Sequence, residues 1–131
     1  MRADRTTDRP PDAGRALAIV YRRFGGPEVL ERDMLPMPEP ASGEVLLRHT
    51  AIGVNFSDVN ARRGGVYPGA AEMLPAIPGN EAVGDVVTVG SDVDGFRPGD
   101  KVAYVGMGGA FFADTGAYAT YRAVPAHRLI P

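Results

Sequence analysis

The sequence predicts a mainly β domain, built as a barrel or sandwich of short strands with one short helix. Short stretches of apolar and β-branched residues recur along the chain between clusters of glycine and proline, which number 17 and 12 among the 131 residues. One segment carries the cap and stop residues of a helix. A chain of this length fits a single domain with one hydrophobic core.

The first element is predicted to be a hairpin that follows an unstructured start. Residues 1–15 mix Arg, Asp, Thr and Pro without periodicity, so we expect a disordered leader. Residues 16–21 are a strand candidate, and the turn cluster at 24–27 separates them from a second short segment at 29–34. Three prolines between residues 36 and 40 then favour an extended connector.

The middle of the chain predicts a strand that runs directly into a helix. Residues 44–54 are long and apolar enough for a central strand. Asn55 or Ser57 can then cap a short helix, and Gly64 can end it. Polar side chains therefore gather at a corner between strand and helix.

The second half predicts strands separated by turns. A loop rich in Pro and Gly spans residues 67–79, and residues 81–90 are small and β-branched, as in a strand. A Pro-Gly turn at 98–99 leads into a strand that ends near 105, and residues 116–123 alternate small and aromatic side chains, which indicates one more strand.

Composition excludes several classes of function. Cysteine is absent, which removes disulfides, thiolate metal sites and cysteine nucleophiles. The formal net charge of −2 and the interleaved charges provide no basic face for nucleic acid. No apolar run approaches the ~20 residues that span a bilayer, and the N-terminus lacks the apolar stretch of a signal peptide. We expect a soluble cytoplasmic protein.

A series of short motifs runs along the chain from about Ala16 to Pro131. They are Gly53-Val54-Asn55-Phe56-Ser57-Asp58, Arg63-Gly64, Tyr67-Pro68, Pro75, Pro78 to Gly84, Val89-Gly90, Pro98 to Val102, Gly116 to Tyr121 and Val124-Pro125-Ala126. In order and spacing they resemble the N-terminal domain of medium-chain dehydrogenases and reductases, in the quinone oxidoreductase branch. The resemblance implies a GroES-like, partly open β barrel with one or two short helices over residues 16–131.

The same resemblance bears on metal binding. Zinc enzymes of this superfamily carry Cys where Asn55 stands and His where Asn80 stands, ahead of a Glu that matches Glu81. A carboxamide oxygen is a poor zinc ligand compared with thiolate or imidazole. We therefore expect no zinc here, and the resemblance is to the zinc-free reductases of the superfamily.

The resemblance implies hydride transfer from NADPH to a quinone or an α,β-unsaturated carbonyl. Without a metal, hydrogen-bond donors must stabilise the negative charge that collects on the substrate oxygen. By resemblance, Asn55 and Tyr67 line the cleft for nicotinamide and substrate, and Ser57 stands where zinc enzymes carry a hydroxyl of their proton relay. We expect Asn55, Ser57 and Tyr67 to be catalytic, and Asn55 and Tyr67 also to contact the cofactor.

Supporting roles and plainer readings stand beside this assignment. Capping alone explains the residue type at Asn55, and Tyr67 before Pro68 can simply cover the edge of the core. Buried carboxylates are usually tied to backbone amides or to an Arg. Four polar residues are expected to have supporting structural roles: Asp58, Asn60, Asn80 and Glu81.

Other chemistry-bearing residues are assigned to structure. The run 106–109 lacks the third glycine and the following helix of a dinucleotide loop, so we expect a plain loop. His49 and His127 have no third ligand or nucleophile at a useful spacing and are expected to be structural or to face solvent. Arg62-Arg63 complements the dipole at the helix end and is expected to be a solvated pair, with a cofactor phosphate as the alternative.

Two hypotheses for function remain open. In the resembling superfamily a Rossmann domain binds the nucleotide, and no such βαβ unit occurs in this sequence. The first hypothesis is therefore a substrate-side domain that is inactive unless it is joined to or paired with a nucleotide-binding domain. The second is a free-standing β module that binds a small apolar molecule or a protein without catalysis. The residues are compatible with quinone, enone or alcohol substrates and with NADPH or NADH.

Overall fold

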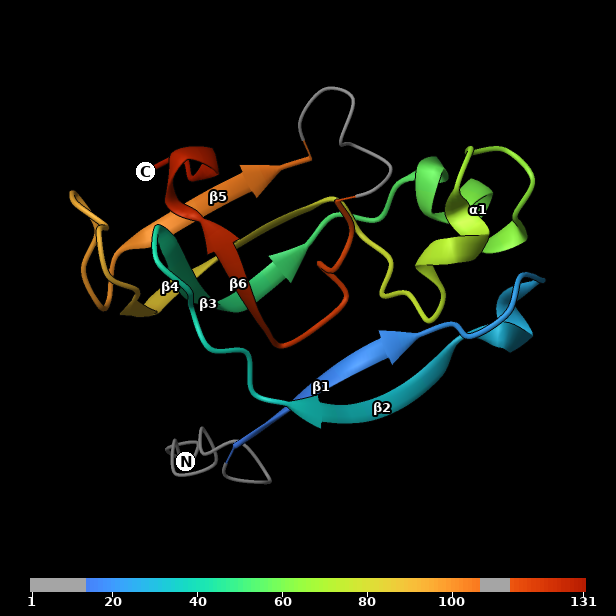
Figure 1. Cartoon of the computed structure of the whole chain (residues 1–131), viewed down its shortest axis with the longest axis horizontal. Coiled ribbons are helices and arrows are strands. Elements are labelled where there is room, and N and C mark those ends of the chain that lie inside the picture. The colour runs from blue at the N-terminus through green and yellow to red at the C-terminus, as the bar shows by residue number, and fades with distance from the viewer. Residues whose placement is uncertain (1–13, 107–113) are drawn as a thin grey trace, which may run out of the picture.

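The computed structural model describes residues 14–106 and 114–131, in which six strands form two antiparallel sheets (Figure 1). Residues 1–13 of the expected leader and most of the 106–109 loop lie outside the described residues. The strands are β1 (Arg15–Val20), β2 (Glu31–Pro36), β3 (Glu44–Ile52), β4 (Glu81–Val89), β5 (Lys101–Val105) and β6 (Tyr121–Pro125). Helix α1 spans Phe56–Arg63, and short 3₁₀ turns span Pro27–Val29, Ala70–Met73 and Ala126–Arg128.

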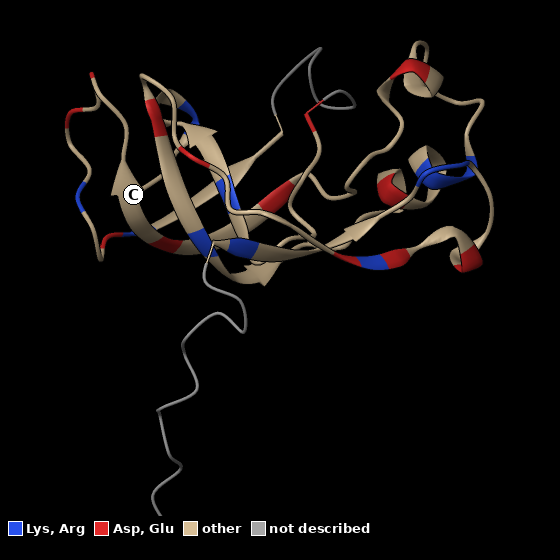
Figure 2. Ribbon diagram, turned by 60° about the horizontal axis from the view of Figure 1, so that its bottom comes forward, with Lys and Arg blue, Asp and Glu red and all other residues tan. Residues whose placement is uncertain are grey.

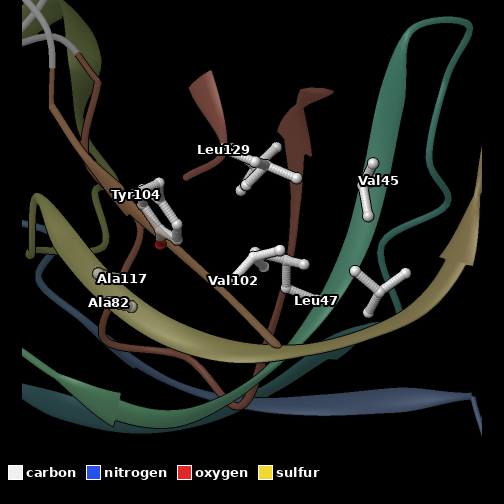
Figure 3. Close-up of a cluster of buried hydrophobic side chains, with 9 residues drawn as sticks. Val45, Leu47, Ala82, Val102, Tyr104, Ala117 and Leu129 are labelled. Atoms are coloured by element: carbon white, nitrogen blue, oxygen red, sulfur yellow. The ribbon is translucent and has the colours of Figure 1, made fainter. Parts of the chain in front are cut away.

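The larger sheet has the strand order β5-β4-β3-β6, so the long strands β3 and β4 lie at its centre. Two register shifts between β3 and β4, at Leu46/Leu47 and His49/Ala51, bend the pair. Inward-facing residues of all four strands meet in one core around Val45 and Leu47 (Figure 3). Tyr104 lies in this core at 1% exposure, so its hydroxyl needs a polar partner inside the fold.

The hairpin of β1 and β2 forms the smaller sheet and lies along the lower side of the larger one in Figure 1. Side chains of β1 alternate between buried and partly exposed, as expected for a strand with one face on a core. The segment before β6 connects the two sheets, because Ile19 N–H donates to Tyr118 O and Thr120 N–H donates to Leu17 O, both at 2.9 Å. The sheets do not close into a barrel, which confirms the mainly β, partly open fold.

The strand predicted at 116–123 is the main correction. The structure begins the strand β6 only at Tyr121, five residues later than expected. Gly116 and Ala117 donate their backbone N–H groups to Gly79 O, whereas Ala119 forms an isolated bridge with Ala18. The first half of the predicted strand thus divides its hydrogen bonds between two distant partners and cannot continue one ladder.

Helix α1 has the boundaries that its local residues predict. Asn55 is its N-cap, and Gly64 follows it with φ 78°, a left-handed value that glycine adopts without strain. Arg62 does not form the solvated pair that was expected with Arg63. It is 8% exposed and donates from Nη1 to Gly25 O at 2.7 Å, so it ties the helix to the turn between β1 and β2.

Charges are mixed over the described chain, with Lys and Arg interleaved among Asp and Glu (Figure 2). Within residues 14–106 and 114–131, no helix has the length and apolar character needed to cross a membrane.

Candidate functional site

A small recess lies where the start of α1, the loop after it and the residues before β4 meet. Its volume is about 10 Å³, which is close to the space of one water molecule. Two residues predicted to be catalytic, Ser57 and Tyr67, line it together with two predicted supporting residues, Asp58 and Asn80. The remaining lining residues are Ala61, Pro78 and Thr115.

Ser57 and Asn80 join the two sides of this recess. The Ser57 hydroxyl donates to Asn80 Oδ1 at 3.2 Å, although the two residues are 23 positions apart. Asn80 directly precedes β4 and is 3% exposed, so its side chain is fixed inside the fold. A hydroxyl held in this way can exchange its acceptor for a substrate oxygen without moving the backbone.

Asp58 is the anchor of the corner between β3 and α1. It is 7% exposed, and its Oδ2 accepts from the backbone N–H of Asn55 and from the Tyr118 hydroxyl, both at 2.9 Å. The buried carboxylate is thus tied to a backbone amide. Burial together with the Asp58 charge raises the pKa of Tyr118 well above its usual value and raises that of Tyr21 as well. Both phenols therefore keep their protons at neutral pH.

The other predicted residues lie near the recess but do not line it. Asn55 occupies the cap position of α1, and the Asn60 carbonyl accepts from Gly64 N–H at 3.2 Å. Glu81 folds over Gly53, where a Cβ would come within 2.0 Å of Glu81 Oε1. Glycine at position 53 therefore makes room for the Glu81 side chain, and this packing is a structural role for Glu81.

A second polar cluster surrounds the buried Tyr104 hydroxyl and was not foreseen. His49 Nδ1 lies 2.7 Å from Ala119 O, and a carbonyl can only accept, so Nδ1 carries the proton. The opposite nitrogen, Nε2, then accepts from the Tyr104 hydroxyl at 3.0 Å. Burial is the main cause that lowers the pKa of His49, in keeping with a neutral ring. His49 is thus structural.

Two arginines complete this cluster. Arg122 Nη1 donates to the Tyr104 hydroxyl at 3.3 Å, and its Nη2 pairs with Asp114 at 2.8 Å. Arg128 also pairs with Asp114 and donates to Val105 O at 3.1 Å. Both guanidinium groups lie within 6 Å of the Tyr104 ring centre, at 5.3 and 5.8 Å. The cluster fastens the last residues of the chain to β5.

Sequence reasoning missed two residues: Thr115, which lines the recess, and Tyr118, which donates to Asp58. Tyr118 stood inside a predicted strand, where alternation suggests only which face a side chain takes. Its aromatic ring within a run of small residues, Gly116 to Thr120, was the available signal. Its partner Asp58 lies 60 positions away, so the pairing has no local signature.

Metal ligands do not gather in the described part of the chain, where no three His, Cys, Asp or Glu side chains could hold an ion together. The donor chemistry agrees with this at the recess, whose inward polar residues are hydroxyls, a carboxamide and one engaged carboxylate. Carboxamide oxygens favour hard cations over zinc, so these residues do not fit a catalytic zinc ion.

The fold and the recess define a substrate-side β domain of the kind found in dehydrogenases and reductases. Comparison with protein families matches residues 41–131 to the alcohol dehydrogenase GroES-like domain. The chain therefore belongs to this family and to the medium-chain dehydrogenase/reductase superfamily, as its motifs predicted.

Individual relatives are mostly quinone oxidoreductases. A quinone oxidoreductase of Pseudomonas aeruginosa is 49% identical over 90 residues, which cover 68% of this chain and 26% of that protein. The structure of Escherichia coli quinone oxidoreductase complexed with NADPH aligns with a TM-score of 0.75 and 33% identity, over 87% of this chain and 32% of that one. A human synaptic vesicle membrane protein VAT-1 homolog-like protein aligns with a TM-score of 0.78 and 30% identity, over 88% and 35%. The chain thus spans roughly a quarter to a third of such relatives.

Proposed function

We propose that the chain is the substrate-side domain of an NADPH-dependent, zinc-independent reductase that transfers hydride to a quinone or an enone. The observation that carries this proposal is the recess beside α1, which has room for about one oxygen atom and is lined by Ser57, Tyr67 and Asn80. A quinone ring is far larger than this recess. It would lie over the opening and place one carbonyl oxygen inside.

The chemistry at that oxygen requires donors. When hydride reaches one end of a conjugated carbonyl system, negative charge collects on the oxygen at the other end. Hydroxyl and amide N–H groups aimed at this oxygen stabilise the charge, and more so when water is excluded. In this proposal Ser57 and Tyr67 donate to the oxygen, and Ser57 gives up its hydrogen bond to Asn80 Oδ1 to do so, because its hydroxyl carries one proton.

An exposed apolar stripe beside the recess supports a role for a second domain. Val54 and Phe56 are 75% and 71% exposed, and Ile52 just before them is 39% exposed. They flank Asn55, the residue expected to contact nicotinamide. A nucleotide-binding domain seated on this stripe would bury it, exclude water from the recess and supply the phosphate contacts that the described residues do not offer. NADPH, when bound there, provides the hydride.

The proposal is tested by separating substrate binding from turnover. In a ¹⁵N NMR titration with 2-cyclohexen-1-one, we expect signals of Ser57, Tyr67 and Asn80 to shift, and Ser57→Ala to weaken the affinity. NADPH with 1,4-benzoquinone should give almost no turnover by the isolated chain. Shifts confined to other residues would contradict the assignment of the recess, and fast turnover would contradict the need for a second domain.

A second candidate function rests on a different feature, a shallow groove of about 290 Å³ along β4 and β5. Ile52, Val83 and Val105 line it, and its size is at the lower end of ligand pockets. This groove favours a module that binds a small apolar molecule without chemistry. The same titration distinguishes the two candidates, because such a ligand would shift the signals of Val83 and Val105 and leave Ser57 unchanged.

A further inference from the structure

We propose that Tyr118 is the positioning residue of the recess, holding Ser57 and Asn80 at hydrogen-bond distance by clamping the start of α1 to the loop before β4. The inference rests on the proposed function for what the recess binds. The clamp itself is a property of the fold. Tyr118 belongs to neither element and contacts both.

On the side of the loop, Tyr118 contacts the residues directly before Asn80. Its backbone N–H donates to Pro78 O at 2.9 Å. Its ring lies against Gly79, where a Cβ would come within 2.6 Å of Tyr118 Cδ1, and Gly79 has a φ of 101°. The ring therefore occupies the space that a side chain at position 79 would need, and this close approach fixes the path of the chain into Asn80.

On the side of the helix, Tyr118 acts through Asp58. Its hydroxyl donates to Asp58 Oδ2 at 2.9 Å, and the same oxygen accepts from the backbone N–H of the N-cap Asn55. Ser57 lies between these two residues in the sequence. A shift of the Asp58 carboxylate would thus move the first turn of α1, and with it the Ser57 hydroxyl.

The Ser57–Asn80 hydrogen bond closes the loop of contacts that starts at Tyr118. At 3.2 Å this bond is longer than the upper limit of about 3.0 Å that is usual from a hydroxyl donor to an oxygen, so it contributes little by itself to holding the two elements together. A bond from a phenol to a charged, buried carboxylate is stronger. The bond from Tyr118 to Asp58 therefore sets the distance between the start of α1 and the loop before β4, and the Ser57–Asn80 bond forms at that distance.

The chemistry of Tyr118 assigns it to positioning and not to proton transfer. Burial, with the bond to Asp58, raises the pKa of Tyr118 well above its usual value, so the phenol keeps its proton. Its hydroxyl already donates to Asp58, and Tyr118 does not line the recess. A substrate oxygen in the recess would meet Ser57 and Tyr67 instead.

The test uses Tyr118→Phe, which keeps the ring on Gly79 and removes only the hydroxyl. We expect faster amide hydrogen exchange at Asn55, shifted side-chain amide signals of Asn80, and unchanged signals around Tyr104. Affinity for 2-cyclohexen-1-one should fall, because Ser57 and Asn80 are no longer held in one arrangement before the ligand binds. Tyr121→Phe on β6 removes a hydroxyl from a residue that does not line the recess and is the matched control.

The outcomes separate the clamp from the proposed function. If Asn55 exchange and the Asn80 signals are the same in Tyr118→Phe and Tyr121→Phe, the clamp is overturned, whatever the enone does. If those signals change but the original chain does not bind the enone, the clamp stands and the proposed substrate fails. Asp58→Ala removes the oxygen that accepts both bonds and serves as a second variant. It should reproduce the Asn80 shifts, and unshifted signals would overturn the clamp equally.

Discussion

Replacing Tyr104 by Phe measures how much the buried cluster around its hydroxyl stabilises the fold. The ring stays in the core, so no cavity larger than a hydroxyl forms. Two hydrogen bonds disappear, one to His49 Nε2 at 3.0 Å and one from Arg122 at 3.3 Å. Arg122 keeps its pair with Asp114, whereas Nε2 of the half-buried His49 ring loses its donor.

We expect the free energy of unfolding to fall by about 2 kcal/mol. Roughly 1 kcal/mol comes from the bond from Arg122, and a similar or larger amount comes from the imidazole nitrogen that loses its donor. Domains of this size are stable by only about 5–15 kcal/mol, so the loss is a large fraction. Urea denaturation followed by circular dichroism at pH 7.5 measures it, with Tyr121→Phe as the control. A difference from the control below about 0.5 kcal/mol, the usual scatter of surface substitutions, would show that the Tyr104 hydroxyl does not stabilise the fold.

Three further predictions address pH, backbone and capping. Burial lowers the pKa of His49 in the folded chain, so the unfolded chain binds the proton first and the free energy of unfolding should fall as pH drops below about 6.5. Urea titrations should show this slope reduced in His49→Gln and unchanged in the exposed control His127→Gln. Gly79→Ala should lower the free energy of unfolding by about 2–4 kcal/mol, because the new Cβ adds both φ strain and overpacking. Gly95 has a φ of 85° and open space around it, so Gly95→Ala should lower the same quantity by about 1 kcal/mol. Equal losses would contradict the close packing at position 79. Asn55→Ala should lower stability by about 1 kcal/mol and Asn55→Asp by less, and no loss in thermal melts would remove the capping role.

Local signals in the sequence predicted the elements whose ends are fixed by adjacent residues. The boundaries of α1 follow from Asn55 and Gly64, and both act within one turn of the helix. The hairpin of β1 and β2 was predicted from the turn residues at 24–27, which lie between the two strands. The family resemblance predicted Asn55, Ser57 and Tyr67 as the catalytic set. The fold brings Ser57 and Tyr67 to one recess together with Asn80, whereas Asn55 does not line it.

Features that depend on distant partners escaped prediction. Residues 116–120 have strand-like composition, but Gly79 and Leu17 take their hydrogen bonds in different directions. Arg62 at a helix end resembles a solvated cation until Gly25, 37 positions earlier, supplies a carbonyl. His49 offered no pattern because its partners Tyr104 and Ala119 are 55 and 70 positions away.

Strand β2 has its ladder with β1 on one side, and its charged start has a consequence for contacts between copies of the chain. Glu31, Arg32 and Asp33 follow one another there, and Arg22 binds both acidic groups. An incoming strand from another molecule would have to bury these charges or break their ion pairs. These charges thereby disfavour edge-to-edge aggregation through β2, and neutral residues at these positions would remove that protection.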